Sequence, residues 1–148
     1  MEFFFGHGMI APVLALVAWT LFMQLWLYAA RIPAMRKAEV NLEDVRQGRP
    51  VNPLPPQVTR VADNFNHLHE QPTIFYALAL AAQLAGATDL WSLHLAWAYV
   101  VIRVLHSLIQ ATVNIIPIRF LVFTISSFAL LALLVRTAAQ VWGWTLPF

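Results

Sequence analysis

Residues 60–72 read Arg-Val-Ala-Asp-Asn-Phe-Asn-His-Leu-His-Glu-Gln-Pro and are followed at once by the apolar run Thr-Ile-Phe-Tyr-Ala-Leu-Ala-Leu. On a helix that turns about 100° per residue, the polar members of this stretch fall within roughly 120° of one another. This polar stripe consists of Arg60, Asp63, Asn64, His67, Glu70 and Gln71. Ionisable groups are costly inside a bilayer, so we expect the stripe to face protein or water and to mark a functional site. The alternative is a buried polar seam that only fixes helix register.

The composition indicates a single membrane domain. Of the 148 residues, 60% are hydrophobic and 11% are charged, whereas soluble domains carry roughly a quarter charged residues. The net charge is only +2 and the basic residues form no groove-like pattern, so nucleic acid is not expected as a partner. The absence of cysteine excludes disulfides, zinc–thiolate sites and a protein thiol nucleophile, so any reactive thiol must arrive with a ligand.

Four apolar segments predict an all-α integral membrane protein. The expected spans cover about residues 9–35, 57–86, 90–114 and 117–142. Residues 36–56 are polar and rich in proline, and we expect an extended loop there. Pro72 lacks a backbone N–H group, so the second helix should kink just past Glu70.

The basic residues predict the orientation of these spans. Most of them lie at the face that carries the loop, namely Arg31, Arg36, Lys37, Arg46, Arg49, Arg60 and Arg119. The opposite face has only Arg136. By the positive-inside bias, the loop is cytoplasmic and both termini lie on the other side, with the protein in the inner membrane if it is bacterial.

A second polar stripe lies on the third predicted helix. Its members are three or four residues apart, and they are Arg103, His106, Gln110 and Asn114. The short turn at residues 86–89 makes the second and third helices antiparallel neighbours. Counted from their cytoplasmic ends, Glu70 is about 20 Å deep and Arg103 about 17 Å deep. An acid and a guanidinium at equal depth can neutralise each other, which would explain how the membrane tolerates either.

The two stripes together predict a polar pocket in the cytoplasmic half of the bundle. His67, His106 and Gln110 should lie one or two turns nearer the cytoplasm than Glu70 and Arg103. The predicted rim of this pocket is basic and consists of Arg31, Arg60 and Arg119. Guanidinium groups bind carboxylates and phosphates, so the pocket should favour an anionic ligand.

Other chemistries are less well supported. The motif His67-Leu-His69 is not a metal pair, since residues two apart on a helix point about 160° apart. A metal site built from His67, His106 and Glu70 remains an alternative, but we assign no metal ligand. No Ser–His–acid arrangement has a recognisable nucleophile elbow.

Several short motifs resemble one family. On the second helix they are Asn64-Phe65, His67-Leu-His-Glu70, Pro72 and Phe75-Tyr76. Together they resemble the signature of the MAPEG family, the membrane-associated proteins in eicosanoid and glutathione metabolism. Arg103-Val-Leu-His106 and Pro117-Ile-Arg119 stand where that family has Arg-x-x-His and Pro-x-Arg. The four-span layout, the long basic loop and the chain length also fit.

The resemblance implies a left-handed four-helix transmembrane bundle that assembles as a homotrimer. It further implies glutathione bound between protomers in the cytoplasmic half, with a hydrophobic small-molecule co-substrate entering from the lipid. By the same resemblance, Glu70 would hold the amino group of glutathione and Arg119 would activate its thiol. Arg31 and Arg60 would meet its carboxylates. The remaining candidate binding residues are His67, Arg103, His106 and Gln110.

The sequence also departs from the family pattern. His67 stands where glutathione-using members commonly have asparagine, and Asp63 where they often have arginine. Gln110 and Phe123 replace tyrosines of the eicosanoid-pathway enzymes, so a specific eicosanoid synthase is not expected.

Three functions are therefore weighed. The first is a membrane-bound, glutathione-dependent transferase or peroxidase that acts on hydrophobic electrophiles or lipid hydroperoxides. The second is a non-catalytic, MAPEG-like scaffold that binds a lipid or an anion. The third, a small transporter or channel component, is disfavoured because residues 73–85 leave no polar path outward.

Overall fold

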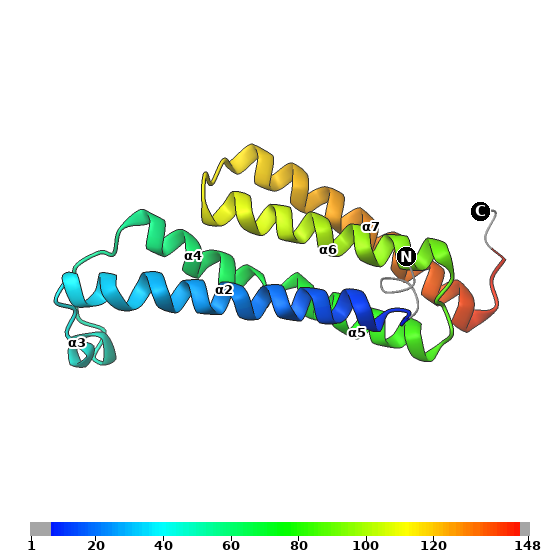
Figure 1. Cartoon of the computed structure of the whole chain (residues 1–148), viewed down its shortest axis with the longest axis horizontal. Coiled ribbons are helices and arrows are strands. Elements are labelled where there is room, and N and C mark those ends of the chain that lie inside the picture. Colours follow the sequence, from blue (N-terminus) through cyan, green and yellow to red (C-terminus); the bar gives the residue numbers. More distant parts are fainter. Residues whose placement is uncertain (1–6, 146–148) are drawn as a thin grey trace.

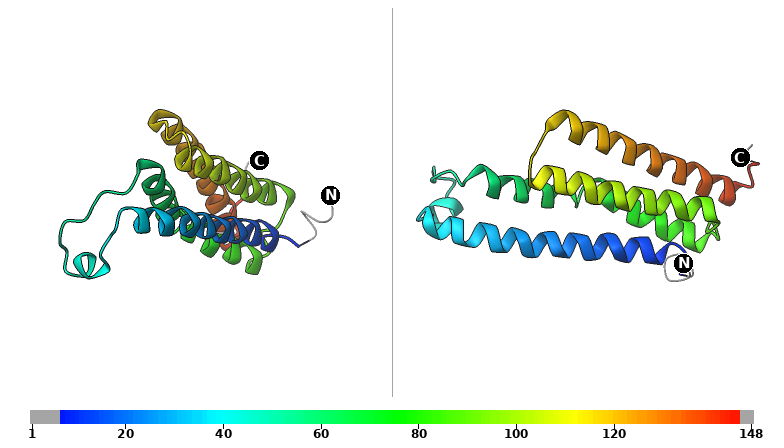
Figure 2. Two further views of the ribbon diagram at one scale, coloured as in Figure 1. Left: turned by 60° about the vertical axis from the view of Figure 1, so that its left-hand side comes forward. Right: turned by 45° about the horizontal axis from the view of Figure 1, so that its top comes forward.

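The computed structural model describes residues 7–145, which contain helices and turns but no strand. In chain order the helices are α2 (Ile10–Lys37), α3 (Leu42–Arg46), α4 (Pro56–His67), α5 (Gln71–Leu84), α6 (Leu90–Ala111) and α7 (Ile116–Trp142). Figure 1 shows α4 and α5 following one another along the length of α2, beside an antiparallel pair formed by α6 and α7. Two further views show the same arrangement, with α3 projecting at the end opposite the start of α2 and the end of α7 (Figure 2).

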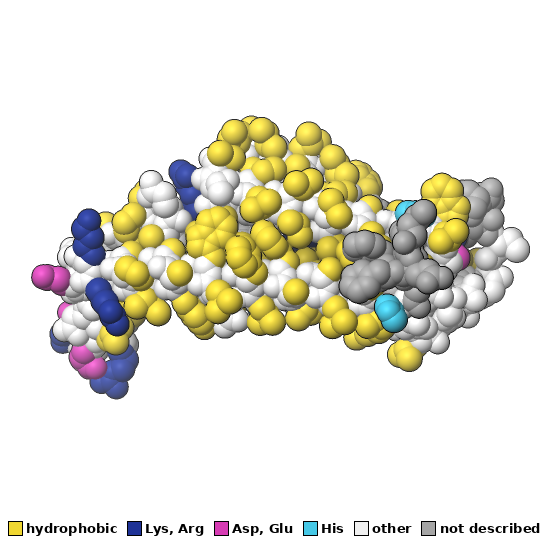
Figure 3. Space-filling model, viewed as in Figure 1, with side chains coloured by type: hydrophobic (Ala, Val, Ile, Leu, Met, Phe, Trp, Pro, Cys, Tyr) yellow, Lys and Arg dark blue, Asp and Glu magenta, His cyan; other side chains and the backbone are white. Residues whose placement is uncertain are grey.

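The long helices are those of a membrane protein. Three of them, α2, α6 and α7, are long and apolar enough to cross a bilayer. Apolar side chains cover the middle of the molecule, whereas lysine and arginine gather at the α3 end (Figure 3). The prediction of an all-α membrane protein is thus confirmed. Because α4 and α5 are only 12 and 14 residues long, and a span needs about 20, the four-span bundle stays a prediction.

The second predicted helix is interrupted, where we expected only a kink. α4 ends at His67 and α5 begins at Gln71, with Glu70 at φ −92° and ψ −99° between them. Pro72 has no N–H to donate to the carbonyl of Leu68, and its ring clashes with that carbonyl in a continuous helix. At the start of a new helix the same proline is tolerated. The chain therefore starts a new helix at this point.

Two other boundaries differ from expectation. The 36–56 loop is not wholly extended, because Asn41 accepts a hydrogen bond of 2.9 Å from the backbone N–H of Glu43 and caps α3. α6 ends at Ala111, and Asn114 has a positive φ of 53° in the turn that follows. Asn114 therefore leaves the polar stripe of this helix.

A buried polar node joins three helices beside the apolar core. The hydroxyl of Ser107 on α6 accepts hydrogen bonds from Asn64 Nδ2 (2.7 Å) and from Trp19 Nε1 (3.0 Å). Nearby, Phe75 stacks on Tyr99 with ring centroids 4.6 Å apart. Since hydrogen bonds between helices are directional, the node fixes how α4 and α2 are rotated against α6.

The turn before α6 is held by one carboxylate. Asp89 caps the helix by accepting from the backbone N–H groups of Trp91 and Ser92, and its Oδ1 lies 2.7 Å from Arg136 Nη2. Burial alone raises the pKa of Asp89, but the hydrogen bonds from Ser92 and the charge of Arg136 outweigh it. The pKa therefore lies below its usual value.

We expect Asp89→Asn to lower the free energy of unfolding by about 0.5 kcal/mol, because asparagine keeps the cap but loses the charge. Asp89→Ala removes both and should cost about 1–2 kcal/mol. A lowered folded-state pKa contributes stability above the unfolded value of about 3.9, and this contribution is lost as the pH falls through the folded value. Thermal unfolding in detergent, followed by circular dichroism, measures both effects.

The matched control is Glu43→Gln, which removes an exposed ion pair with Arg46 and should leave the unfolding temperature unchanged. A difference between the wild type and Asp89→Asn that stays constant from pH 7 to pH 2 would contradict the assignment.

Candidate functional site

A buried guanidinium lies at the centre of the polar cluster. Arg103 is 1% exposed, and its Nη2 donates to the backbone carbonyl of His67 over 3.4 Å. Its Cζ lies 5.1 Å from the ring centre of Phe123 and 5.9 Å from that of Tyr99. Nε and Nη1 have no hydrogen-bond partner among the described residues. A buried charge normally has all its donors satisfied, so the three N–H groups on these two nitrogens suit a ligand.

The carbonyl that Arg103 contacts is a product of the helix interruption. In a continuous helix, the carbonyl of His67 would accept from the N–H of Gln71. At the end of α4 it accepts instead from the N–H of Glu70, at 3.3 Å, and from Arg103. The break thus supplies an acceptor for the buried arginine.

Two histidine rings contact each other edge-on, and the backbone of one of them, His67, accepts from Arg103. The rings of His67 and His106 have centroids 6.2 Å apart, and His106 also contacts Phe123 at 6.0 Å. His67 Nδ1 lies 3.0 Å from Glu70 Oε2, which is within ion-pair distance. The geometry of this contact is not that of a regular hydrogen bond. His106 is buried, whereas the His67 side chain is 36% exposed. The cluster is therefore reachable from the His67 side.

Glu70 does not form an ion pair with Arg103, although equal depth on neighbouring helices suggested that it could. Among the described residues, its ion-pair contact is with His67, and its side chain is 62% exposed. The physical reason is the break before α5. Glu70 precedes the first turn of the new helix, so the helical stripe that places Asn64 and His67 inward does not extend to it.

Three amide side chains have buried oxygens without a partner among residues 7–145, and they are Asn64, Gln71 and Gln110. Gln110 is buried with no partner for Oε1 among residues 7–145. Gln71 donates from Nε2 to the Ser127 hydroxyl over 2.9 Å, and its Oε1 has no partner in the described chain. Buried amide oxygens need N–H donors. They therefore suit a ligand that carries peptide N–H groups.

The three predicted rim arginines separate into a pair and an outlier. Arg60 Nη1 donates to the carbonyl of Thr112 over 3.0 Å, and Arg119 Nη1 donates to Asn114 Oδ1 over 2.5 Å. Both thus approach the turn between α6 and α7. Arg31 is exposed on α2, and it makes no hydrogen bond or ion pair to this cluster.

The two aromatic side chains that contact Arg103, Tyr99 and Phe123, are not among the site residues predicted from the sequence. Tyr99 precedes Arg103 by four residues, and this spacing places both on one face of α6. Helical spacing therefore predicts their contact. Phe123 comes from α7, and only the packing of α7 on α6 brings it over the guanidinium.

No metal centre is formed by the described residues, in which no group of three or more His, Cys, Asp or Glu side chains lies close enough to hold an ion. His69 turns away from His67, and its Nδ1 contacts the carbonyl of Phe65 at 2.8 Å.

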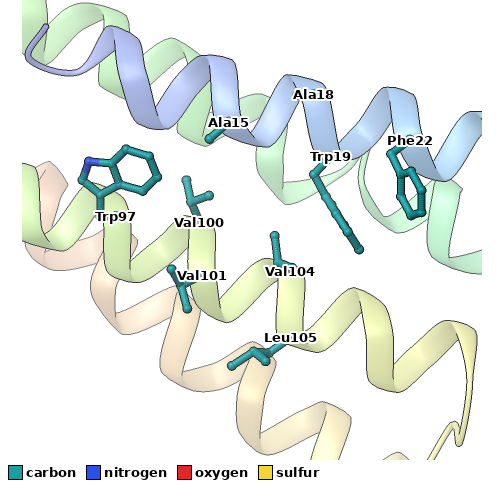
Figure 4. Close-up of a pocket in the computed structure, with 9 residues that line it drawn as sticks. All are labelled: Ala15, Ala18, Trp19, Phe22, Trp97, Val100, Val101, Val104 and Leu105. Carbon is teal, nitrogen blue, oxygen red and sulfur yellow. The ribbon is translucent and has the colours of Figure 1, made fainter. Parts of the chain in front are cut away.

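A separate apolar groove of about 600 Å³ lies between α2 and α6. Figure 4 shows its lining side chains, which include Trp19 and Phe22 from α2 and Trp97 and Val101 from α6. On α6 the groove residues are centred about 120° away from Arg103. The groove can accept an apolar molecule from the lipid, but it does not open onto the polar cluster.

The comparison with protein families agrees with the motifs on α4–α7. The model of the MAPEG family matches residues 9–139, which is nearly the whole chain. No curated protein and no solved structure matches the chain. With the helical membrane architecture and the buried arginine–histidine cluster, this match shows that the chain belongs to the MAPEG family, the membrane proteins of eicosanoid and glutathione metabolism.

Proposed function

We propose that this chain is a membrane-bound, glutathione-dependent transferase or peroxidase that acts on hydrophobic electrophiles or lipid hydroperoxides. The observation that carries the proposal is the buried guanidinium of Arg103, which has two nitrogens without a hydrogen-bond partner beside a histidine that solvent can reach. Such a group is expensive to bury unless a ligand completes it.

The residues present suit the groups of glutathione. The tripeptide carries two carboxylates, an ammonium, two amide N–H groups and a thiol. Arg103 can donate to a carboxylate or thiolate, and the exposed carboxylate of Glu70 suits the ammonium. The free oxygens of Gln71 and Gln110 suit the amides. Arg60, at the cytoplasmic end of α4, is available for a second carboxylate.

Arg119 is the candidate for thiol activation. A free thiol has a pKa of about 8.5, so only about 3% is thiolate at pH 7. A guanidinium that lowers this pKa by about two units makes the thiolate the majority form. Arg119 lies in the first turn of α7, where the positive end of the helix dipole adds to the same effect.

We further propose the homotrimer and the orientation with the α3 loop in the cytoplasm. The exposed Glu70 carboxylate lies at the interruption of a segment that must otherwise cross the apolar core of the membrane. A neighbouring protomer and a bound ligand would cover it there.

One observation favours the non-catalytic scaffold as the second candidate. Arg119 donates a hydrogen bond to Asn114 in the turn between α6 and α7. An arginine with this contact can stabilise the turn without taking part in catalysis. The scaffold would still bind a lipid or anion at Arg103.

We expect the detergent-purified protein to bind glutathione in isothermal titration calorimetry at millimolar ligand. Arg103→Leu should weaken binding at least about tenfold, because a charge-assisted hydrogen bond contributes about 1.5–3 kcal/mol. The same change should raise the unfolding temperature without ligand, since it replaces an unpaired buried charge by an apolar group. If the well-folded wild type gives no binding heat, the glutathione-dependent enzyme is excluded and the non-catalytic scaffold becomes the proposed function.

We expect Arg119→Ala to reduce conjugation of a chlorinated aromatic probe about 25-fold at pH 7. This is the loss of thiolate when the thiol pKa returns from about 6.5 to 8.5. The deficit should vanish at alkaline pH, where the thiol ionises unaided. Arg46→Ala, which removes an exposed arginine on α3, is the control. A rate that is unchanged at pH 7 would assign Arg119 to the turn alone.

We expect the α3 loop to be cytoplasmic. The native chain has no cysteine, so the single replacements Gln47→Cys and Gln140→Cys report on the two ends of the bundle. In intact cells a membrane-impermeant maleimide should label position 140, and it should label position 47 only after permeabilisation. The reverse pattern would invert the proposed orientation.

A further inference from the structure

We propose that His67, held by Glu70, is the proton shuttle of the site: it accepts the thiol proton of glutathione and returns it to the leaving group. This inference rests on the proposed function and adds a catalytic residue to it. The geometry behind it is the contact of 3.0 Å between His67 Nδ1 and Glu70 Oε2 at the interruption between α4 and α5.

The arginines cannot take this proton. A guanidinium stays protonated at all accessible pH values and carries donors only. Arg103 and Arg119 can therefore stabilise a thiolate but cannot receive what the thiol releases. A histidine is the side chain suited to accept a proton near neutral pH and to give it back.

The contact with Glu70 determines which nitrogen is basic. An ionised carboxylate attracts the N–H of a neutral ring, and Nδ1 is the ring nitrogen that lies 3.0 Å from Oε2, at ion-pair distance although outside regular hydrogen-bond geometry. We therefore place the proton of the neutral ring on Nδ1. Nε2 is then the unprotonated nitrogen of the neutral ring, and it has no hydrogen-bond partner among residues 7–145. Glu70 Oε1 remains free for the ammonium of glutathione, so one carboxylate can serve both groups.

The surroundings of His67 distinguish it from the other histidines. His106 is buried, and His69, which follows the end of α4, contacts Phe65 with ring centroids 4.5 Å apart. Of these three histidines, His67 is the one with a carboxylate contact, and its side chain is 36% exposed.

Three titratable or charged groups contact His67, namely Glu70 at the start of α5 and Arg103 and His106 on α6. Arg119 on α7 acts on the neighbouring His106 through its charge. On its own helix, α4, the charged residues are Arg60 and the exposed Asp63. The part of α2 that packs on α4 contributes the apolar Met23 and Leu27. Glu70 is thus the acidic group in contact with the His67 ring.

The proton is needed in only one of the two reactions. In the first step His67 Nε2 takes the proton of the thiol, which leaves a thiolate and an imidazolium. With a chlorinated aromatic compound, an S–C bond forms and chloride leaves without a proton. With a hydroperoxide, an S–O bond forms, the O–O bond breaks, and the alkoxide takes the proton from His67. A second glutathione then attacks the sulfenic sulfur, forming the S–S bond and releasing water.

The test compares both reactions in the full-length protein and in His67→Asn. This substitution leaves the backbone carbonyl of residue 67, which accepts a hydrogen bond from Arg103, in place. With an organic hydroperoxide, kcat should fall about a hundredfold, within the range for loss of general acid–base catalysis. Conjugation of the chlorinated aromatic probe should fall about tenfold at most. Added imidazole should restore part of the hydroperoxide reaction of the variant. In the wild type the peroxidase rate should fall at alkaline pH, where the imidazolium that donates the proton is lost, and the variant should not show this fall.

His69→Asn is the matched control, two residues away and outside the cluster, and both its rates should stay at the wild-type level. His67→Gln provides a second variant, and circular dichroism checks the fold of each. An equal loss of both reactions in folded His67 variants, or no loss in either, overturns the shuttle while the proposed function stands. A folded wild type that neither binds nor turns over glutathione removes both proposals, and a wild type that conjugates but reduces no hydroperoxide removes the shuttle.

Discussion

The interruption of the helix between His67 and Gln71 is the constraint on which the site depends. Inside a membrane, every backbone polar group needs a partner, because water is not available to supply one. Pro72 prevents a continuous helix, and the carbonyl of His67 then accepts from Arg103 on a neighbouring helix. One local defect thus accommodates a buried guanidinium and leaves the Glu70 carboxylate exposed.

The polar and the apolar surfaces of α6 lie on different sides of this helix. One side of this helix carries Arg103 and His106 among aromatic rings. About a third of a turn away, the groove against α2 is lined by tryptophan, phenylalanine and valine. Ser107 lies between the two regions and is hydrogen-bonded from both α2 and α4. A hydrophilic ligand and a molecule from the lipid would therefore meet different faces of the helix.

Helical periodicity predicted part of the candidate site. It placed Asn64 and His67 on a face directed into the protein, and it grouped Arg103, His106 and Gln110, which are indeed buried or lie in the cluster. The same reasoning was wrong about a pairing of Glu70 with Arg103, because a period holds only along an unbroken helix. Arg31 is exposed in the single chain, and its predicted place at a site between protomers stays a prediction.

The sequence by itself determined the membrane character, the three long helices and membership of the MAPEG family. These properties depend on the lengths of apolar runs, on proline and on short motifs, all of which are local. Only the tertiary structure decided which group satisfies Arg103, where Glu70 points and which histidine has a carboxylate beside it. The physical reason is that the chain direction after a helix break is set by packing between helices. A difference of one residue in where α5 begins would rotate Glu70 by about 100° and give it a different partner.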